Sequence, residues 1–155
     1  MTAPAAVQFY DVVVFFHVLA MVLAFGPGFA YGLFFANAAK HSPAALPSIA
    51  STVLIWSRTV TLIGALVVLA SGLYLVEDRW EHSDFFVAWG ELAILILLAL
   101  NLFFFIPTTR KFIAAAEAGR GEEAQAIAVK QRVVGPITGI IVILTVYVMT
   151  AKPFL

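Results

Sequence analysis

The sequence predicts an all-α integral membrane protein, an antiparallel bundle of four helices. Hydrophobic residues make up 63% of the 155 residues and charged residues only 12%. A soluble domain is about half apolar and about a quarter charged, so much of this chain must face lipid. The apolar residues are also gathered into four runs, each close to the length of about 20 residues that a helix needs to cross the hydrocarbon core.

The four predicted spans cover about 12–35, 54–76, 85–106 and 133–150, and together they make residues 1–155 a single transmembrane domain. The first connection, AKHSPAALPS, should be a short loop because it contains two prolines, and the second, EDRWEHSD, should be tight and acidic. The third should be helical on both sides of Gly-Arg-Gly. KFIAAAEA continues the third span, and EEAQAIAVKQR opens the fourth helix with acidic residues in its first turn.

The distribution of cationic residues predicts the orientation. Lys40 lies in the first connection, and the third carries or adjoins Arg110, Lys111, Arg120, Lys130 and Arg132. Cytoplasmic loops are enriched in lysine and arginine. We therefore expect a multi-pass protein of the bacterial cytoplasmic (inner) membrane, with connections one and three in the cytoplasm and both termini outside. The first span lacks a basic n-region and is too long for a cleaved signal peptide.

The first span contains a row of small residues spaced four apart: Ala20, Ala24, Gly28, Gly32 and Ala36. Residues four apart share a helix face, and small residues let helices approach closely in lipid. The row therefore predicts the tightest helix contact.

His17 precedes Ala20 by three residues and should point into the bundle with this row. Gly26-Pro27-Gly28 predicts a kink, because proline breaks the helical hydrogen-bond ladder. The glycines would also let a neighbouring backbone or a flat ligand come close.

Two layers of polar residues are expected inside the bundle. His17 and Glu91 lie at about the same depth, roughly 8 Å from the outer ends of their spans by helical rise, and Ser71 and Thr145 fall near that level. Ionisable groups inside a membrane cost at least about 2.5 kcal/mol and are functional candidates. We expect His17 and Glu91 to face each other, although each has an ordinary structural interpretation as well.

The second layer lies nearer the basic connections and consists of Arg58, Asn101 and Thr138. Arg58 can extend its charge to the headgroups, and Asn101 is typical of hydrogen bonding between helices.

Several functional classes are excluded or lack their motif. The net charge of zero provides no basic field for nucleic acid, and the absence of cysteine excludes disulfides and Cys-based metal sites. His41 and His82 lie in opposite connections, so no cluster reaches the number of ligands that a metal site needs. No glycine-rich phosphate loop precedes a helix, and no serine has a histidine and an acid at usable positions.

Three stretches carry a resemblance to known proteins: FFHVLAMVLAFGPGF, WSRTVTLIGALVVLASG and FFFIPTTRKFIAAAEAGRGEEA. Over nearly the whole chain the sequence resembles the small bacterial membrane proteins called domain of unknown function 2269, a name that implies no activity. More loosely it resembles the HemJ-type protoporphyrinogen oxidases and the copper-resistance D membrane proteins. The HemJ-type likeness implies a haem or porphyrin at His17. The partnering lysine of that pattern is missing, since the third helix has Glu91 and Asn101 and Lys111 lies beyond it.

Three functions follow, in order of preference. The first is an accessory or assembly protein without a complete catalytic site, working in a homo-oligomer or a larger membrane complex. The second is a haem- or redox-linked protein in which His17 binds haem b or a metal, with Met21, Gly28 and Glu91 beside it. The copper-resistance likeness suggests Met21 and Met149 as soft ligands. The third is a proton or small-solute path. The catalytic residues and substrate stay open.

Overall fold

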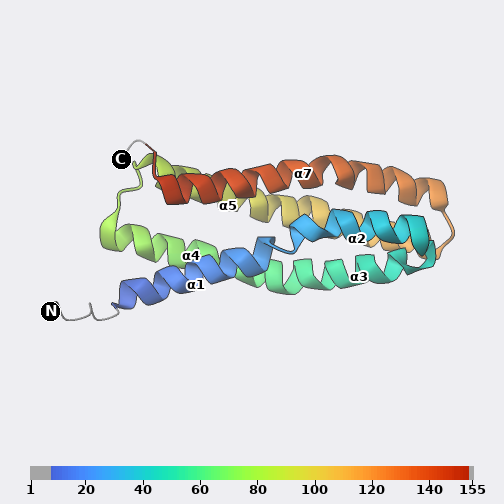
Figure 1. Ribbon diagram of the computed structural model, residues 1–155, viewed down its shortest axis with the longest axis horizontal. Coiled ribbons are helices and arrows are strands. Elements are labelled where there is room, and N and C mark those ends of the chain that lie inside the picture. Colours follow the sequence, from blue (N-terminus) through green and yellow to red (C-terminus); the bar gives the residue numbers. More distant parts are fainter. Residues whose placement is uncertain (1–7, 154–155) are drawn as a thin grey trace.

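The computed structural model describes residues 8–153, and these form four helical rods packed antiparallel (Figure 1). All four are long and apolar enough to cross a membrane. The first rod comprises α1 (Phe9–Phe25) and α2 (Gly28–His41), and the second comprises η1 (Pro43–Ala45), α3 (Leu46–Trp56), η2 (Ser57–Thr61) and α4 (Leu62–Arg79). The third comprises α5 (Phe85–Ala99), η3 (Leu100–Phe105) and α6 (Ile106–Glu117), and the fourth is α7 (Gly121–Ala151). The predicted all-α four-helix membrane bundle is confirmed; the chain ends, residues 1–7 and 154–155, lie outside the described residues.

The rods extend well beyond the apolar runs, since they are 31 to 37 residues long. The stretch AKHSPAALPS, expected as a loop, is mostly helical: α2 continues to His41 and η1 begins at Pro43. That expectation is wrong because both prolines occupy the first turn of a helix, where the missing N–H costs no hydrogen bond. The third connection is as expected, with α6 ending at Glu117 and acidic residues in the first turn of α7.

The helices are irregular at one common level of the bundle. Gly26 and Pro27 separate α1 from α2, while η2 and η3 are π-helical. The Thr61 hydroxyl donates to the Ala24 carbonyl at 3.0 Å, which places the first break beside η2. The fourth rod has Pro136 inside α7. Before Pro136 in α7, Gln131 contacts Thr108 of α6, and after it Thr145 contacts Trp89 of α5. Pro136 therefore lies alongside η3, which connects α5 to α6.

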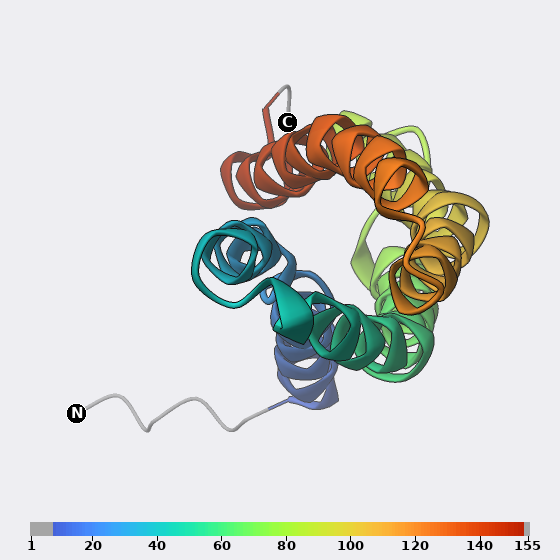
Figure 2. The ribbon, with the colours of Figure 1, turned by 90° about the vertical axis from the view of Figure 1, so that its right-hand side faces the viewer.

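This level divides the bundle into two halves. In the acidic half, which contains the 80–84 connection, α1 packs along α4 and α5 packs along the C-terminal part of α7. In the basic half, α2 contacts α3 and α7, while α3 packs on α6 and α6 on the N-terminal part of α7. Figures 1 and 2 show the first rod changing direction between the two halves. Each half has its own apolar core, which includes Ala65 and Leu97 in the acidic half and Ala50 and Ala115 in the basic half. A further apolar cluster, which includes Phe86 and Val148, lies nearer the acidic connection.

Only the first part of the small-residue row lies at a helix contact. Ala20 and Ala24 are buried, and Ala24 packs directly over Gly64. Gly28 and Gly32 are exposed, and a Cβ at either would meet no atom within 4 Å. The expectation of one continuous contact is wrong, because the break at Gly26 and Pro27 turns α2 so that the four-residue spacing no longer follows one face.

Candidate functional site

His17 lies in the contact between α1 and α4. Its Nδ1 is 2.8 Å from the Ser71 hydroxyl, and a Cβ at Gly72 would lie 3.3 Å from its Cε1. The Ser71 hydroxyl also lies within hydrogen-bond distance of the Val67 and Val68 carbonyls of its own helix. When its hydrogen is donated to one of these carbonyls, the hydroxyl oxygen accepts from Nδ1–H, and in that tautomer the neutral imidazole has its lone pair at Nε2. His17 points into the bundle as expected, but its partner is a hydroxyl of the neighbouring helix.

Glu91 belongs to a different pair. Its Oε1 is 2.7 Å from Nδ1 of His82, and both side chains are partly exposed near the acidic connection. The expectation that His17 and Glu91 face each other is wrong. Equal depth does not make two residues neighbours, since α1 packs along α4 while Glu91 lies on the second turn of α5, within reach of the connection that precedes that helix.

Thr145, the other hydroxyl residue expected in this layer, forms a third separate contact. It accepts a hydrogen bond of 3.2 Å from the Trp89 indole and donates to the Ile141 carbonyl of its own helix. The expected outer layer is thus divided into three pairs, each joining two segments, and it does not converge on one point.

The expected inner layer contributes one interhelical bond. Asn101 is buried in η3 and its amide nitrogen donates to the Ser57 carbonyl of η2 at 3.0 Å. Arg58 is exposed, and Thr138 donates to the Val134 carbonyl one turn earlier in its own helix. Asn101 therefore joins the second and third rods at their π-helical turns. The hydrogen bond of Thr138 stays within α7, and Arg58 lies on the surface.

The methionines considered as metal ligands both pack in the bundle. Met21 lies against the core of the acidic half, and Met149 places its methyl group over Gly90. Gly28, considered for the cofactor site, is exposed at the start of α2. Among residues 8–153 no group of three or more His, Cys, Asp or Glu side chains is arranged to hold a metal ion.

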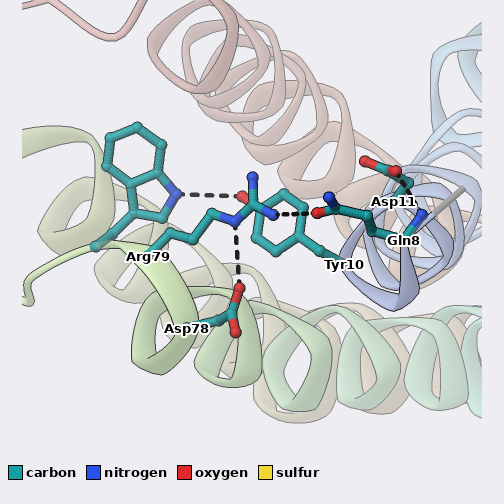
Figure 3. A network of polar contacts seen from close by, with 6 residues as sticks. Gln8, Tyr10, Asp11, Asp78 and Arg79 are labelled. Atoms are coloured by element: carbon teal, nitrogen blue, oxygen red, sulfur yellow. Dashed lines mark hydrogen bonds and ion pairs between the residues drawn. The ribbon is translucent and has the colours of Figure 1, made fainter. Parts of the chain in front are cut away.

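One network was not predicted from the sequence (Figure 3). The Arg79 guanidinium lies 3.8 Å from the centre of the Tyr10 ring and donates to Gln8 Oε1 at 2.8 Å. The Trp80 indole donates to the Tyr10 hydroxyl at 3.2 Å, and Asp78 contacts Arg79. The network joins the start of α1 to the end of α4. Its members are about 70 positions apart in the chain, so local sequence carries no signal for it.

A second unpredicted feature is a groove between α2 and α3 in the basic half. Its volume is about 560 Å³, and its walls include Tyr31, Phe34, Val53 and Trp56. The indole nitrogen of Trp56 is buried without a hydrogen-bond partner. The groove depends on the packing of α2 and α3, so no local sequence signal predicts it.

Comparison of the chain with protein-family models, with curated proteins and with solved structures finds no match. The resemblances to the domain of unknown function 2269, to the HemJ type and to the copper-resistance proteins therefore stay predictions, and the function is inferred from the residues themselves.

Proposed function

We propose that this chain is an accessory or assembly protein of the bacterial inner membrane, and that the polar residues inside its bundle hold the helices together. The observation that supports this best is the bond from Asn101 to the Ser57 carbonyl, a buried amide at the level where the helices are irregular. Hydrogen bonds between membrane helices stabilise by about 0.6 kcal/mol on average. The accessory role implies a partner in the membrane, either further copies of this chain or a larger complex.

The other cross-helix contacts support the same role. His17 meets Ser71, Thr61 meets the Ala24 carbonyl, and Trp89 meets Thr145. Each satisfies a polar group that would otherwise be costly in lipid. None of them places a carboxylate beside His17 to move a proton, and Glu91 pairs with His82 instead. A proton or small-solute path is therefore the least supported of the three hypotheses.

The orientation is part of the proposal. The basic connections face the cytoplasm by the positive-inside rule, which puts both termini outside. We expect a reporter enzyme fused after Leu155 to be active only when it is of the kind that works outside the cytoplasm. Activity of the matching cytoplasmic reporter at the same position would reverse the orientation, and a fusion after Ala118, in a basic connection, is the control with the opposite expected result.

A haem-linked protein is the second candidate because of the contact between His17 and Ser71. A metal-bound histidine usually donates its other ring N–H to a neighbour, and the Ser71 hydroxyl, 2.8 Å from His17 Nδ1, is such a neighbour when Nδ1 carries the hydrogen. Haem b, when bound, would supply iron for Nε2 to ligate. Met21, another residue considered for this site, lies one turn further along α1.

Five purified proteins distinguish the two candidates: wild type, His17→Ala, Glu91→Gln, the double variant of these two, and His82→Ala as a control. The accessory role predicts no haem absorption band. It also predicts melting changes that add within about 0.5 kcal/mol, because the two residues have separate partners.

Two results would contradict the accessory role. A haem band that disappears in His17→Ala but persists in His82→Ala would support the haem candidate. Strong non-additivity between His17→Ala and Glu91→Gln would show that both residues serve one site.

A further inference from the structure

Arg58 lies near the middle of the bundle, where an arginine is costly in lipid. It belongs to η2, between α3 and α4 (Figure 1), and the carbonyl of the preceding Ser57 accepts from Asn101. Asn101 follows Glu91 by ten positions and precedes Arg110 by nine, or about 15 Å and about 14 Å of helical rise. Glu91 and Arg110 are thus about 29 Å apart along the rod, close to the hydrocarbon thickness of about 30 Å. Arg58 therefore lies near the centre of the bilayer.

Arg110 marks the basic border of this apolar layer together with Arg132. Gln131 of α7 donates to Thr109 of α6, so the two arginines, each next in sequence to one of these residues, lie at one level. Both are exposed and can extend to the headgroups. About 12 Å separate this level from Arg58 by helical rise along the third rod, which exceeds the length of an arginine side chain. Extension alone therefore does not bring the Arg58 charge to the headgroups.

No group of this chain pairs with the Arg58 guanidinium. Among residues 8–153 it makes no hydrogen bond, ion pair or ring contact, and its side chain is exposed. Charged residues within a membrane almost always face the protein interior or a water-filled cavity, and they pair with one another or with backbone carbonyls. Arg58 has none of these in this chain, so its partner is expected outside it.

A second copy of this chain does not supply that partner. Of its carboxylates, Glu91 is the nearest to Arg58 in level, yet it lies about 15 Å away by helical rise and pairs with His82. The other carboxylates lie at or beyond the ends of the apolar runs: Asp11, Glu77, Asp78, Glu81, Asp84, Glu117, Glu122 and Glu123. Because Arg58 is central, inverting the second copy does not bring a carboxylate to its level either. A lipid phosphate lies at the headgroup level, which Arg110 and Arg132 already occupy.

The surface beside Arg58 is apolar. Ile55, three positions before it, and Leu66, eight positions after it, are both exposed, and residues at these spacings share a helix face. Apolar side chains gain little by exchanging lipid for another helix, so they do not by themselves select a partner. The charge does, because only an acidic helix relieves it.

We propose that Arg58 pairs with an aspartate or glutamate carboxylate in the middle of a transmembrane helix of another protein, and that this helix docks along Ile55 and Leu66. The proposal names the kind of partner that the accessory role implies, and it rests on that role. The guanidinium fork matches the two oxygens of a carboxylate, and the positive charge favours the ionised form of the partner.

Binding of synthetic membrane helices to the full chain tests the pair. The probes are peptides of leucine and alanine with tryptophan at both ends, with glutamate at the centre of one and glutamine at the centre of the other. Association is measured by energy transfer in phosphatidylcholine vesicles. Wild type should bind the glutamate peptide about tenfold more tightly, the factor expected when a charge-assisted hydrogen bond replaces a neutral one. Arg58→Gln should bind both peptides equally.

Arg110→Gln is the matched control, since Arg110 is also exposed but lies at the border of the membrane. It should keep the tenfold preference. Arg58→Gln should melt in detergent at the temperature of wild type, because Arg58 has no partner among the described residues; a clear loss would place its role inside the bundle and overturn the proposal.

Three binding results would also overturn it. These are equal binding of both peptides by wild type, a preference for glutamate that persists in Arg58→Gln, and an equal loss of preference in Arg110→Gln, which would indicate attraction at the headgroups. The accessory role itself is tested separately, by the spectra and melting of the His17 and Glu91 variants, so either proposal can fail without the other.

Discussion

Gly64→Ala should lower the melting temperature of the purified protein, although alanine favours helix more than glycine does. An added Cβ would lie 2.8 Å from the Ala24 Cβ and 3.2 Å from the Ala20 carbonyl oxygen. The first obstacle is attached directly to the α1 backbone and the second is part of it, so α1 and α4 must move apart. Overpacking of this kind costs about 1–3 kcal/mol, which exceeds the gain in helix propensity of about 1 kcal/mol.

Two other glycines are matched controls for this change. At Gly90 the added Cβ would meet the terminal methyl group of Met149, and a flexible methionine can move away at little cost. At Gly28 it would meet nothing within 4 Å. Thermal melting in detergent should therefore rank Gly64→Ala well below Gly90→Ala and Gly28→Ala. If Gly64→Ala melts with or above wild type, α1 and α4 do not pack as closely as the structure places them.

The fold was well predicted from the sequence because the apolar residues that face lipid form continuous runs along the chain. Four apolar runs gave four spans, and the Gly-Arg-Gly break with its acidic successor located the third connection. The helix ends were underestimated at the first connection, where α2 continues to His41. At the first connection, prolines were taken to mark a loop, yet they occupy helix starts at Pro43 and Pro47.

The candidate site was predicted less well, because depth and periodicity do not determine neighbours. Helical rise placed His17 and Glu91 at one level, but lateral position depends on which helices pack together, and α1 packs on α4. The row from Ala20 to Ala36 was expected to form one contact although Gly26-Pro27-Gly28 predicted a kink, and the break there takes Gly28 and Gly32 out of the helix contact. The π-helical turn that begins at Ser57 contains no proline or glycine that would predict it. In contrast, η3 is followed by Pro107, which has no N–H to continue the backbone hydrogen bonds of the helix.

Asn101 was correctly expected to join helices, and the bond it makes carries the main claim about this protein. The residue is buried, with 6% of its surface exposed, and its partner is a backbone carbonyl in a π-helical turn. A carbonyl available at an irregular turn is a common place for a side chain from another helix to bind. The bond therefore fixes the second and third rods at the level where the bundle changes direction.

Asn101→Leu should destabilise the protein by about 1 kcal/mol, between the average and the largest values measured for hydrogen bonds between membrane helices. Leucine has a similar size and suits an apolar interior, so the loss reports the missing amide and not an empty space. Asn37→Leu is the matched control, because Asn37 is exposed on α2. In detergent, its melting temperature should stay close to that of wild type.

Thermal melting of Asn101→Leu against Asn37→Leu is therefore the most direct test of the claim that the interior polar residues hold the bundle together. The claim predicts a clear loss of stability for Asn101→Leu alone. An Asn101→Leu variant that is as stable as wild type, or more stable, would contradict it, because the buried amide would then add nothing to the stability of the bundle.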